Sequence, residues 1–319
     1  MQQRFEGRVV VLAGGLSHER DVSLRSGRRV AESLRDSGLE VEERDVDATL
    51  VPALGRDRPA CVVPLLHGET GEDGALREVL ELLRLPYVGS RPEACRIAFD
   101  KPVAKTVVQG AGLATPTAVA LPHETFREVG AAAMMDALLF RLGLPLVVKP
   151  VRGGSALGCS VVRDESALPG AMVACFAYGA VALVEQFIEG TEVAVPVVES
   201  DAGTARALPA VEIRPDGGFY DYSARYTAGS TEFVVPATLP EEVAQACASA
   251  AVTAHTALGL RDFSRSDLIV DADGKVVFLE VNVAPGMTET SLVPLSVEAE
   301  GLELGQMCAQ LVETAVARG

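Results

Sequence analysis

The sequence contains no tryptophan, few aromatic residues (5%) and only four lysines among its 28 basic residues. No long apolar run follows the basic residues near the start of the sequence. The first apolar run comes after Arg8 and covers only residues 9–13, and Gly14 and Gly15 then turn the chain. A membrane-spanning helix needs about 20 apolar residues, and a signal peptide needs a longer apolar core behind its positive charges. We therefore expect neither a membrane span nor a signal peptide.

Disulfide and zinc frameworks are also not expected. The six cysteines are scattered and form no Cys-x-x-Cys motif, which is typical of reduced core residues in a cytoplasmic protein. The 44 acidic residues outnumber the basic ones, and the net charge of −16 would repel polyanions. The composition thus predicts a cytoplasmic protein without a nucleic-acid or membrane partner.

The length of 319 residues and the hydrophobic content of 48% suit two or three subdomains. In residues 1–89 apolar strands alternate with helices, which predicts a βαβ domain with a parallel sheet. Glu19 and His67 each follow a strand, and ligands gather at the carboxyl ends of strands in such sheets. We therefore expect both side chains in one cleft, with solvated loop residues as the alternative. The Gly14–Gly15 pair does not form a dinucleotide fingerprint.

The most informative stretch is the apolar strand at residues 276–282, which two polar residues interrupt. Glu280 and Asn282 are two residues apart, so both side chains leave the same face of the strand. A preceding strand offers Asp267 in the same expected hairpin, and Arg265 shares the face of that acid. Carboxylate and amide oxygens are hard ligands of the kind that hold Mg²⁺. The alternative is a solvated hairpin face.

A nucleotide site is indicated in the middle of the chain. Lys149 ends an apolar strand, and the glycine-rich loop 153–158 follows it, with Lys101 upstream. Backbone N–H groups of such a loop can bind phosphates, with lysines supplying charge, although no Walker motif is present. Glu185 and Glu192 could accept hydrogen bonds from a base and a ribose. An ordinary hairpin loop and exposed edge carboxylates are the alternatives.

Residues 219–236 show little periodicity and concentrate aromatic side chains, so we expect a long functional loop that acts as a lid. Regular elements are expected around it: a long helix ending at Gly143, a helix from about Glu241 to Leu258, and a C-terminal helix over residues 302–317.

Eight blocks of the sequence occur in the order and at the intervals of one known family. On these residues the chain resembles the D-alanine–D-alanine ligases of the ATP-grasp superfamily over essentially its whole length. The blocks are residues 14–24, 67–74, 100–101, 149–155, 185–192, 219–226, 265–267 and 280–292.

The resemblance implies an α/β (α+β ATP-grasp) fold: an N-terminal parallel βαβ domain (1–89), a central ATP-grasp subdomain (90–184) and a C-terminal one (185–319). It also implies ATP, two Mg²⁺ ions (with Mn²⁺ as an alternative) and D-alanine as ligands. The implied nucleotide-binding residues are Lys101, Lys149, Glu185, Glu192, Phe219 and Arg225, and the implied metal ligands are Asp267, Glu280 and Asn282.

The remaining implied roles concern the two substrates. The first D-alanine would lie against Glu19, with support from Val22 and His67, and its reacting carboxyl group would face Arg265 and Gly286. Ser291, beside Leu292, would bind the second carboxylate, and Ser155 and Tyr226 would join the central subdomain to the lid. The reaction would pass through an acyl phosphate made from the first carboxylate and ATP.

Three departures from the family pattern concern the lid and the loops: Arg225 replaces a lysine, Ala156 a serine, and Val283 a threonine. These departures concern the lid's phosphate contacts and the catalytic efficiency more than the reaction class. The alternative function is an ATP-grasp ligase of the same scaffold with another second substrate, such as D-serine or D-lactate, or with a specialised-metabolite role. Tyr226 argues against the D-lactate form. A non-catalytic nucleotide-binding protein would be expected to lose the metal carboxylates, which are all present. A homodimer is one of the assembly states left open.

Overall fold

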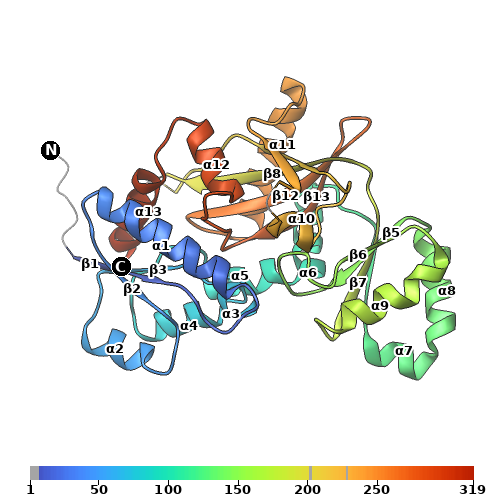
Figure 1. Ribbon diagram of the computed structural model, residues 1–319, viewed down its shortest axis with the longest axis horizontal. Coiled ribbons are helices and arrows are strands. Elements are labelled where there is room, and N and C mark those ends of the chain that lie inside the picture. Colours follow the sequence, from blue (N-terminus) through green and yellow to red (C-terminus); the bar gives the residue numbers. More distant parts are fainter. Residues whose placement is uncertain (1–6, 201–202, 228) are drawn as a thin grey trace.

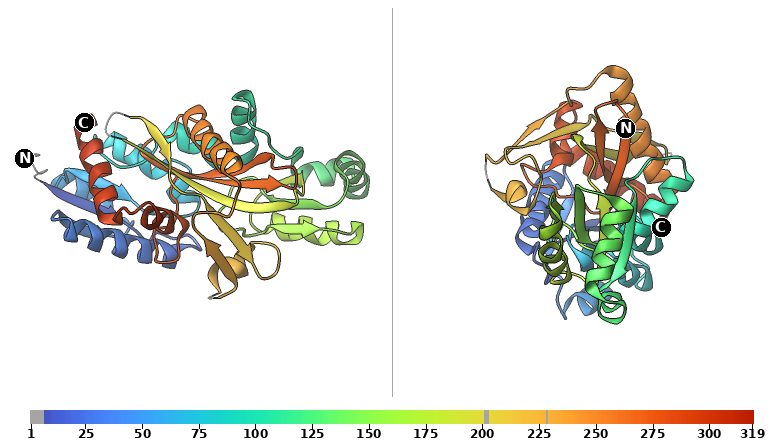
Figure 2. Two further views of the ribbon diagram at one scale, coloured as in Figure 1. Left: turned by 90° about the horizontal axis from the view of Figure 1, so that it is seen from above. Right: turned by 90° about the vertical axis from the view of Figure 1, so that its right-hand side faces the viewer.

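Three β-sheets organise the chain in the computed structural model, which describes residues 7–200, 203–227 and 229–319, without the side chains of Ser223 and Tyr226. The three sheets have strand orders β2-β1-β3, β4-β7-β5-β6 and β11-β10-β8-β12-β13, and β9 pairs with β8 at the side of the last one. Figures 1 and 2 show the first and second sheets at opposite ends of the long axis, with the third between them. The predicted α/β fold is confirmed.

The N-terminal sheet is parallel, as predicted. Val9 and Val11 of its central strand face one hydrophobic core, while Val10 and Leu12 face another. A strand covered on both faces is apolar at every position, which is why β1 shows no alternation. The strands are β1 Arg8–Leu12, β2 Glu40–Arg44 and β3 Cys61–Pro64, and the helices are α1 Arg20–Asp36, α2 Leu50–Arg56, α3 Glu69–Glu72 and α4 Ala75–Leu82.

The central sheet is antiparallel and carries its helices at the outer end of the molecule. The helix rich in Ala, Met and Leu that the sequence predicted up to Gly143 is present as α8, and Gly130 (φ +102°) separates it from a further helix, α7, that was not predicted. A positive φ of this kind favours glycine and cannot continue a right-handed helix. The strands are β4 Ala118–Pro122, β5 Leu146–Pro150, β6 Ser160–Val162 and β7 Val181–Gln186, and the helices are α7 His123–Val129, α8 Ala131–Leu142, η1 Glu165–Ala167 and α9 Leu168–Phe176.

The C-terminal sheet is the largest and packs helices from two parts of the sequence on one face. Its strands are β8 Gly190–Glu199, β9 Ala205–Ala207, β10 Val211–Pro215, β11 Thr231–Val234, β12 Phe263–Asp271 and β13 Val276–Asn282. The helices of this region are α5 Pro92–Phe99, α6 Lys101–Gly110, α10 Tyr222–Tyr226, α11 Glu241–Ala257 and α12 Leu292–Ala299. Helices α5, α6 and α11 share one hydrophobic core with β8, β12 and β13.

The packing of helices and strands can be compared with the domain limits that the sequence predicted at residues 89 and 184. Helices α5 and α6 belong to the core of the C-terminal sheet rather than to that of the central sheet. Strand β7 crosses residue 184 and pairs with β4 and β5. The last helix, α13 Leu304–Arg318, returns to the N-terminal domain and packs beside α1 (Figure 2). The domain limits themselves stay a prediction.

The segment 219–236 is not the plain loop that the sequence predicted. It contains the short helix α10 and the strand β11, whose residues Thr231–Val234 pair with Glu212–Pro215 of β10. A strand of four residues at a sheet edge gives too short an alternation to be separated from loop sequence.

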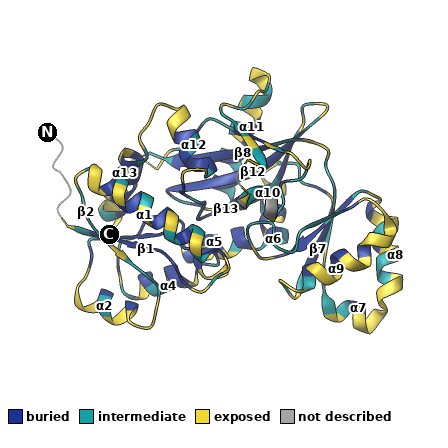
Figure 3. Cartoon of the chain, in the orientation of Figure 1, coloured by how far each residue is buried: buried dark blue, intermediate teal, exposed yellow. Residues whose placement is uncertain are grey.

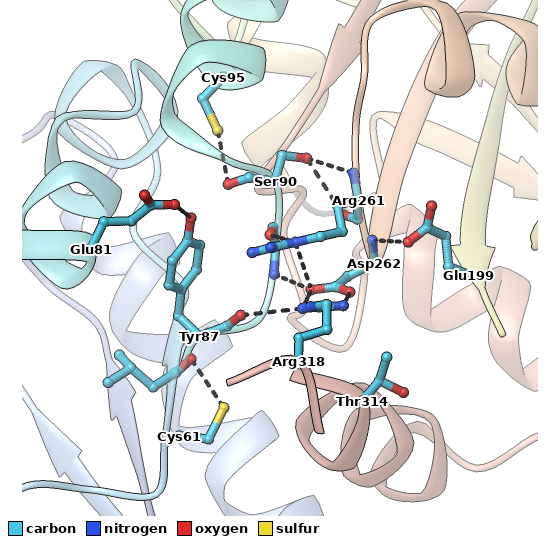
Figure 4. A network of polar contacts seen from close by, with 12 residues as sticks. Cys61, Glu81, Tyr87, Ser90, Cys95, Glu199, Arg261, Asp262, Thr314 and Arg318 are labelled. Atoms are coloured by element: carbon cyan, nitrogen blue, oxygen red, sulfur yellow. Dashed lines mark hydrogen bonds and ion pairs between the residues drawn. The ribbon is translucent and has the colours of Figure 1, made fainter. Parts of the chain in front are cut away.

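A polar network around the buried Asp262 fixes the N-terminal domain to the C-terminal sheet (Figure 4). Asp262, which is fully buried, accepts two hydrogen bonds from the Arg318 guanidinium at 2.5 and 2.8 Å. The same carboxylate accepts from the backbone N–H of Gly89 at 2.6 Å, and Arg261 donates to the Gly89 carbonyl oxygen at 2.9 Å. These contacts between residues far apart in sequence thereby hold the N-terminal domain in a fixed position against the C-terminal sheet.

Figure 3 shows how far each part of the chain is buried. The strands of the C-terminal sheet are largely buried, whereas α7 and α8 present exposed faces at the outer end. Within the described ranges, we find no helix with the length and apolar character needed to cross a membrane.

Candidate active site

Two adjoining cavities lie where the three parts of the molecule meet. The larger, of about 340 Å³, is bounded by β5 and β7 on one side and by β8, β10, β12 and β13 on the other. The smaller is lined by α1, α5 and the loops that follow β3 and β13. Both are lined by Lys101, Gly153, Gly154, Tyr220, Arg225 and Glu280. A volume near 300 Å³ is in the usual range for a small-molecule site.

The hairpin β12–β13 carries the predicted polar face. Asp267 lies directly opposite Glu280, and Arg265 lies opposite Asn282. The Arg265 guanidinium donates two hydrogen bonds to Asp267, at 2.7 and 2.9 Å. Burial alone would raise the pKa of Glu280, but nearby Lys101 and other cations lower it to about 2. The carboxylate is therefore charged, and 30% of its side chain is accessible from the cavity.

These side chains fit a Mg²⁺ ion that is completed by other ligands. Among the described residues, no group of three or more His, Cys, Asp or Glu side chains could hold a metal by itself. The hairpin instead offers two carboxylates and the amide of Asn282, whose Oδ1 also accepts from the backbone N–H of Ala284 at 2.9 Å. Mg²⁺ in enzymes is commonly held by one or two carboxylates together with substrate phosphates and water.

Positive charge gathers at the base of the larger cavity. Lys149, at the end of β5, lies 2.6 Å from one carboxylate oxygen of Glu185 on β7. Lys101 donates to the carbonyl oxygen of Gly153 at 2.8 Å and lies 3.4 Å from Glu280. Burial opposes the charged form of Lys149, but Glu185 outweighs this effect and raises the pKa of the lysine.

The opposite wall of the larger cavity carries Glu192 and the residues predicted for the lid. Glu192 lies on β8, and burial raises its pKa to about 7 although the Arg225 charge acts in the other direction. The Arg225 guanidinium stacks on the Tyr220 ring, 4.2 Å from the ring centroid. Phe219 also lines this cavity. The cavity thus combines aromatic, cationic and acceptor groups.

The loop between β5 and β6 joins the central sheet to the N-terminal domain. The Ser155 hydroxyl donates to the carboxylate of Glu19. A Cβ atom on Gly154 would lie only 3.2 Å from the same carboxylate, so the glycine permits the close approach. Glu19, which the sequence placed in a cleft, therefore lies under this loop at the edge of the smaller cavity. The side chain of Tyr226, predicted to bridge toward Ser155, is outside the described part of the structure.

His67 lies in the same cavity, as expected, but its contacts differ from the prediction. Its Nδ1 is 2.9 Å from the carbonyl oxygen of Ala284, and its Nε2 is 3.2 Å from the Ser26 hydroxyl. Burial lowers the pKa of His67 to about 4, so the ring is neutral at pH 7. No hydrogen bond joins His67 to Glu19 in the described ranges, so any support of Glu19 is indirect.

The loop after β13 closes the smaller cavity. The Ser291 hydroxyl accepts from the backbone N–H of Thr288 at 3.0 Å. A Cβ atom on Gly286 would lie 2.8 Å from that hydroxyl, which makes glycine the residue that fits here. Val22 of α1 and Leu292, the first residue of α12, complete the lining.

Several residues in or behind the cavity walls had no role in the sequence analysis. Glu72 is buried in the smaller cavity, where it accepts from the backbone N–H of Gly68 at 2.9 Å. Arg25 lines the same cavity from α1, one turn after Val22. Lys105 reaches Glu185 from α6. Only the scarcity of lysine pointed to Lys105, and no local pattern distinguishes Glu72 from the acids around it.

Comparisons with known proteins identify the family. The family described as "D-ala D-ala ligase C-terminus" matches residues 107–313, more than half of the chain. A D-alanine–D-alanine ligase of Pelotomaculum thermopropionicum is 38% identical over 309 residues, which cover 97% of this chain and 96% of that protein. This chain belongs to the D-alanine–D-alanine ligase family. One from Anaeromyxobacter dehalogenans is 40% identical, with the same coverage of both chains.

Solved structures of this kind have the same fold. The VanG D-Ala:D-Ser ligase from Enterococcus faecalis superposes with a TM-score of 0.83 at 29% identity, covering 97% of this chain and 99% of that one. A D-alanine–D-alanine ligase from Bacillus anthracis gives a TM-score of 0.80 at 29% identity, covering 98% of each chain. The Bacillus anthracis enzyme complexed with ATP gives 0.77 at 27% identity, again covering 98% of each chain.

The three departures from the family pattern can now be located. Arg225 lines both cavities and keeps a positive charge there. Ala156 lines the larger cavity without a hydroxyl group. Val283 is only 2% exposed and belongs to the hydrophobic core, where a valine needs no hydrogen-bond partner. Two of the departures thus concern the cavities and one concerns packing.

Proposed function

We propose that this protein is an ATP-dependent D-alanine–D-alanine ligase that joins two D-alanines through an acyl phosphate. One observation carries the proposal: two cavities adjoin at Glu280 and Lys101, so a phosphate donor and a carboxylate acceptor can meet there. The names of the relatives, D-alanine–D-alanine ligase, support the substrate. ATP in the related Bacillus anthracis structure supports the donor.

The proposed reaction has two steps. A carboxylate oxygen of the first D-alanine attacks the γ-phosphorus of ATP, the bond from that phosphorus to ADP breaks, and D-alanyl phosphate forms. The uncharged amine of the second D-alanine then attacks the acyl carbon, and inorganic phosphate leaves with the electrons of the broken C–O bond. Such chemistry depends on positioning and charge neutralisation, and the intermediate must be kept from water.

In this proposal the larger cavity binds the nucleotide. Lys101 and Lys149 contact phosphates, since both lysines line the cavity and keep positive charge at its base. The carboxylates of Glu185 and Glu192 accept hydrogen bonds from the base and the ribose. Phe219 packs on the nucleotide, and Arg225 stands between the two cavities.

The smaller cavity binds the amino acids. Glu19 pairs with the ammonium group of the first D-alanine beside Val22, and neutral His67 shapes the wall. Arg265 and the backbone of Gly286 stabilise charge on the reacting carboxyl group. Ser291 at the start of α12 receives the second carboxylate, next to Leu292. Ser155 and Tyr226 belong to the elements that close over the site.

Asp267, Glu280 and Asn282 would hold two Mg²⁺ ions, with Mn²⁺ as the alternative metal. When bound, the cations would supply neutralisation of phosphate charge. The proposal also includes a cytoplasmic location, which the six unpaired cysteines support, and no nucleic-acid partner, in keeping with the net charge of −16. A homodimer stays a prediction.

A second candidate differs only in the second substrate. The similarity to a D-Ala:D-Ser ligase favours D-serine as the alternative acceptor. Phosphate release from ATP and Mg²⁺ would be measured with D-alanine alone, with D-alanine plus D-serine or D-lactate, and with L-amino acids, and products would be weighed by mass spectrometry. D-alanyl-D-alanine from D-alanine alone supports the proposal. A mixed product formed in preference to it would replace the proposal by the alternative.

A further inference from the structure

Lys105 is one of the four lysines and has no part in the reaction described so far. It lies on α6, it is 4% exposed, and its ammonium group contacts one carboxylate oxygen of Glu185. The other oxygen of that carboxylate lies 2.6 Å from Lys149. Glu185 is thus shared by two lysines that approach it from different elements.

The two lysines differ in their access to the nucleotide. Lys149 and Glu185 line the larger cavity, whereas Lys105 does not. Lys105 therefore lies behind Glu185 as seen from the cavity and can affect a ligand only through its neighbours. The cavity contains no side-chain atom of Lys105 that a nucleotide could contact.

Charge counting gives this position a consequence. Burial opposes the charged form of Glu185, yet the two lysines lower its pKa, so the carboxylate is ionised. Burial lowers the pKa of Lys105 to about 8 although Glu185 acts in the other direction, so the lysine is mainly charged at pH 7. One anion and two cations then leave the three residues with close to one net positive charge. Without Lys105, the Glu185–Lys149 pair would be neutral. The Glu185 carboxylate would then balance the charge of Lys149, and less positive charge would remain to attract a phosphate group.

We propose that Lys105 is a positioning residue that keeps the Glu185–Lys149 pair net positive and thereby sets the affinity of the larger cavity for the phosphates of a nucleotide. The inference rests on the proposed function, because it takes the larger cavity to be the nucleotide site. A buried lysine is costly unless it is paired, so its presence at this point requires a compensating contact, which Glu185 provides.

The test compares ADP with adenosine, which share the base and the ribose but differ in the phosphates. Dissociation constants of both would be measured by titration calorimetry at pH 7 in the presence of EDTA, for the wild type and for Lys105→Met. The ratio of the adenosine constant to the ADP constant isolates the phosphate contribution. We expect this ratio to fall about tenfold in Lys105→Met, because one charge at close range is lost. Adenosine binding should change little.

Three further variants separate charge from structure. Lys105→Arg keeps the charge and should retain most of the ratio. Lys105→Met combined with Glu185→Gln again leaves one net positive charge, so the ratio should recover relative to Lys105→Met alone. Lys275→Met removes an exposed lysine in the β12–β13 turn and should leave the ratio unchanged. Recovery in the double variant is not expected if Lys105 only supports packing.

The outcomes are distinguishable. A wild type that binds neither ADP nor adenosine overturns the nucleotide assignment and the inference with it. Binding of both ligands with an unchanged ratio in Lys105→Met overturns the role of Lys105 alone. A ratio that falls in Lys105→Met and falls further in the double variant also overturns it, since accumulated damage indicates a packing role. If Lys105→Met does not fold, the comparison of Lys105→Arg and Lys105→Gln with the wild type decides by the same ratio.

Discussion

Asp267 and Glu280 lie directly opposite each other on β12 and β13, so that one hairpin face presents two carboxylates. Both line the larger cavity. Arg265 binds Asp267 through two hydrogen bonds, and Lys101 lies 3.4 Å from Glu280. Asp267 is buried and Glu280 is partly exposed. Neighbouring carboxylates repel each other, and burial of one of them adds to the cost, so the hairpin depends on cations from the protein or from bound metal.

The first prediction concerns this hairpin. Glu280→Gln keeps the side-chain volume but removes one anionic ligand, so Mg²⁺-dependent phosphate release with D-alanine should fall at least about a hundredfold. The fold should be retained, as measured by circular dichroism. Steady-state rates over a range of Mg²⁺ concentrations would check this.

Asp273→Asn is a matched control for Glu280→Gln, because it makes the same chemical change in the exposed turn of the same hairpin. It should keep the wild-type rate. A Glu280→Gln enzyme as active as Asp273→Asn would show that the hairpin does not hold the metal.

The second prediction concerns the first substrate. If Glu19 pairs with the ammonium group, Glu19→Gln should raise the KM for the first D-alanine far more than the KM for ATP. Loss of a buried charge-assisted contact costs about 2–5 kcal/mol, which corresponds to a rise of at least about thirtyfold. Asp21→Asn, an exposed acid in the first turn of α1, is the control. Equal effects on both constants would contradict the assignment.

The third prediction concerns pH and stability. Burial, together with the nearby Glu19 charge, raises the pKa of Glu72 from 4.5 to about 8. Between these values the folded protein binds more protons at Glu72 than the unfolded chain does. The contribution of Glu72 to stability is therefore fully present below about pH 4.5 and is lost as the pH rises through about 8.

Glu72→Gln resembles the protonated carboxyl group and should remove this pH dependence. The free energy of unfolding of the variant minus that of the wild type should increase from pH 4.5 to pH 8.5, by roughly a few kcal/mol. Denaturant unfolding without ligands at several pH values would measure it. A difference that stays constant with pH would mean that folding does not raise the pKa of Glu72.

The fourth prediction concerns the network around Asp262 (Figure 4). Asp262 is fully buried, whereas the Arg318 side chain is 30% exposed. Removing one partner of a fully buried ion pair typically costs about 3–5 kcal/mol, so Asp262→Asn and Arg318→Gln should each destabilise the protein by no more than that amount. A double-mutant cycle should give a favourable coupling well above 1 kcal/mol. The exposed Arg206–Glu300 pair is the control and should couple by about 0–1 kcal/mol. Similar coupling in both pairs would show that burial does not strengthen the Asp262 contact.

Much of the fold follows from local patterns. The parallel N-terminal sheet, the β12–β13 hairpin and helix α11 agree with the predicted elements because each has a clear period or length. The helix α7, which Gly130 separates from α8, the strand β11 and the helix α12 were missed. Each is short or depends on one backbone angle, and such features are stabilised by neighbours more than by their own sequence.

The candidate site likewise has features that local sequence patterns predict and contacts that only the structure shows. Glu280 and Asn282 could be assigned to one face from sequence, because the strand period is fixed by covalent geometry. The contact between Ser155 and Glu19 joins the central loop to the N-terminal domain, and no local rule gives it. The family roles of these residues stay predictions, whereas the family itself is confirmed.

The sequence alone therefore determined most of the element types, the net charge of −16 and the family, and it predicted the residues that a ligase of this family would use. Those properties depend on composition, on short periods and on motif order, all of which act along the chain. Only the tertiary structure decided that Lys105 shares Glu185 with Lys149, that His67 is neutral and turned toward Ala284, and that Arg318 closes on Asp262. These contacts join residues distant in sequence, and their strength comes from removal of water by packing, which no stretch of sequence contains by itself.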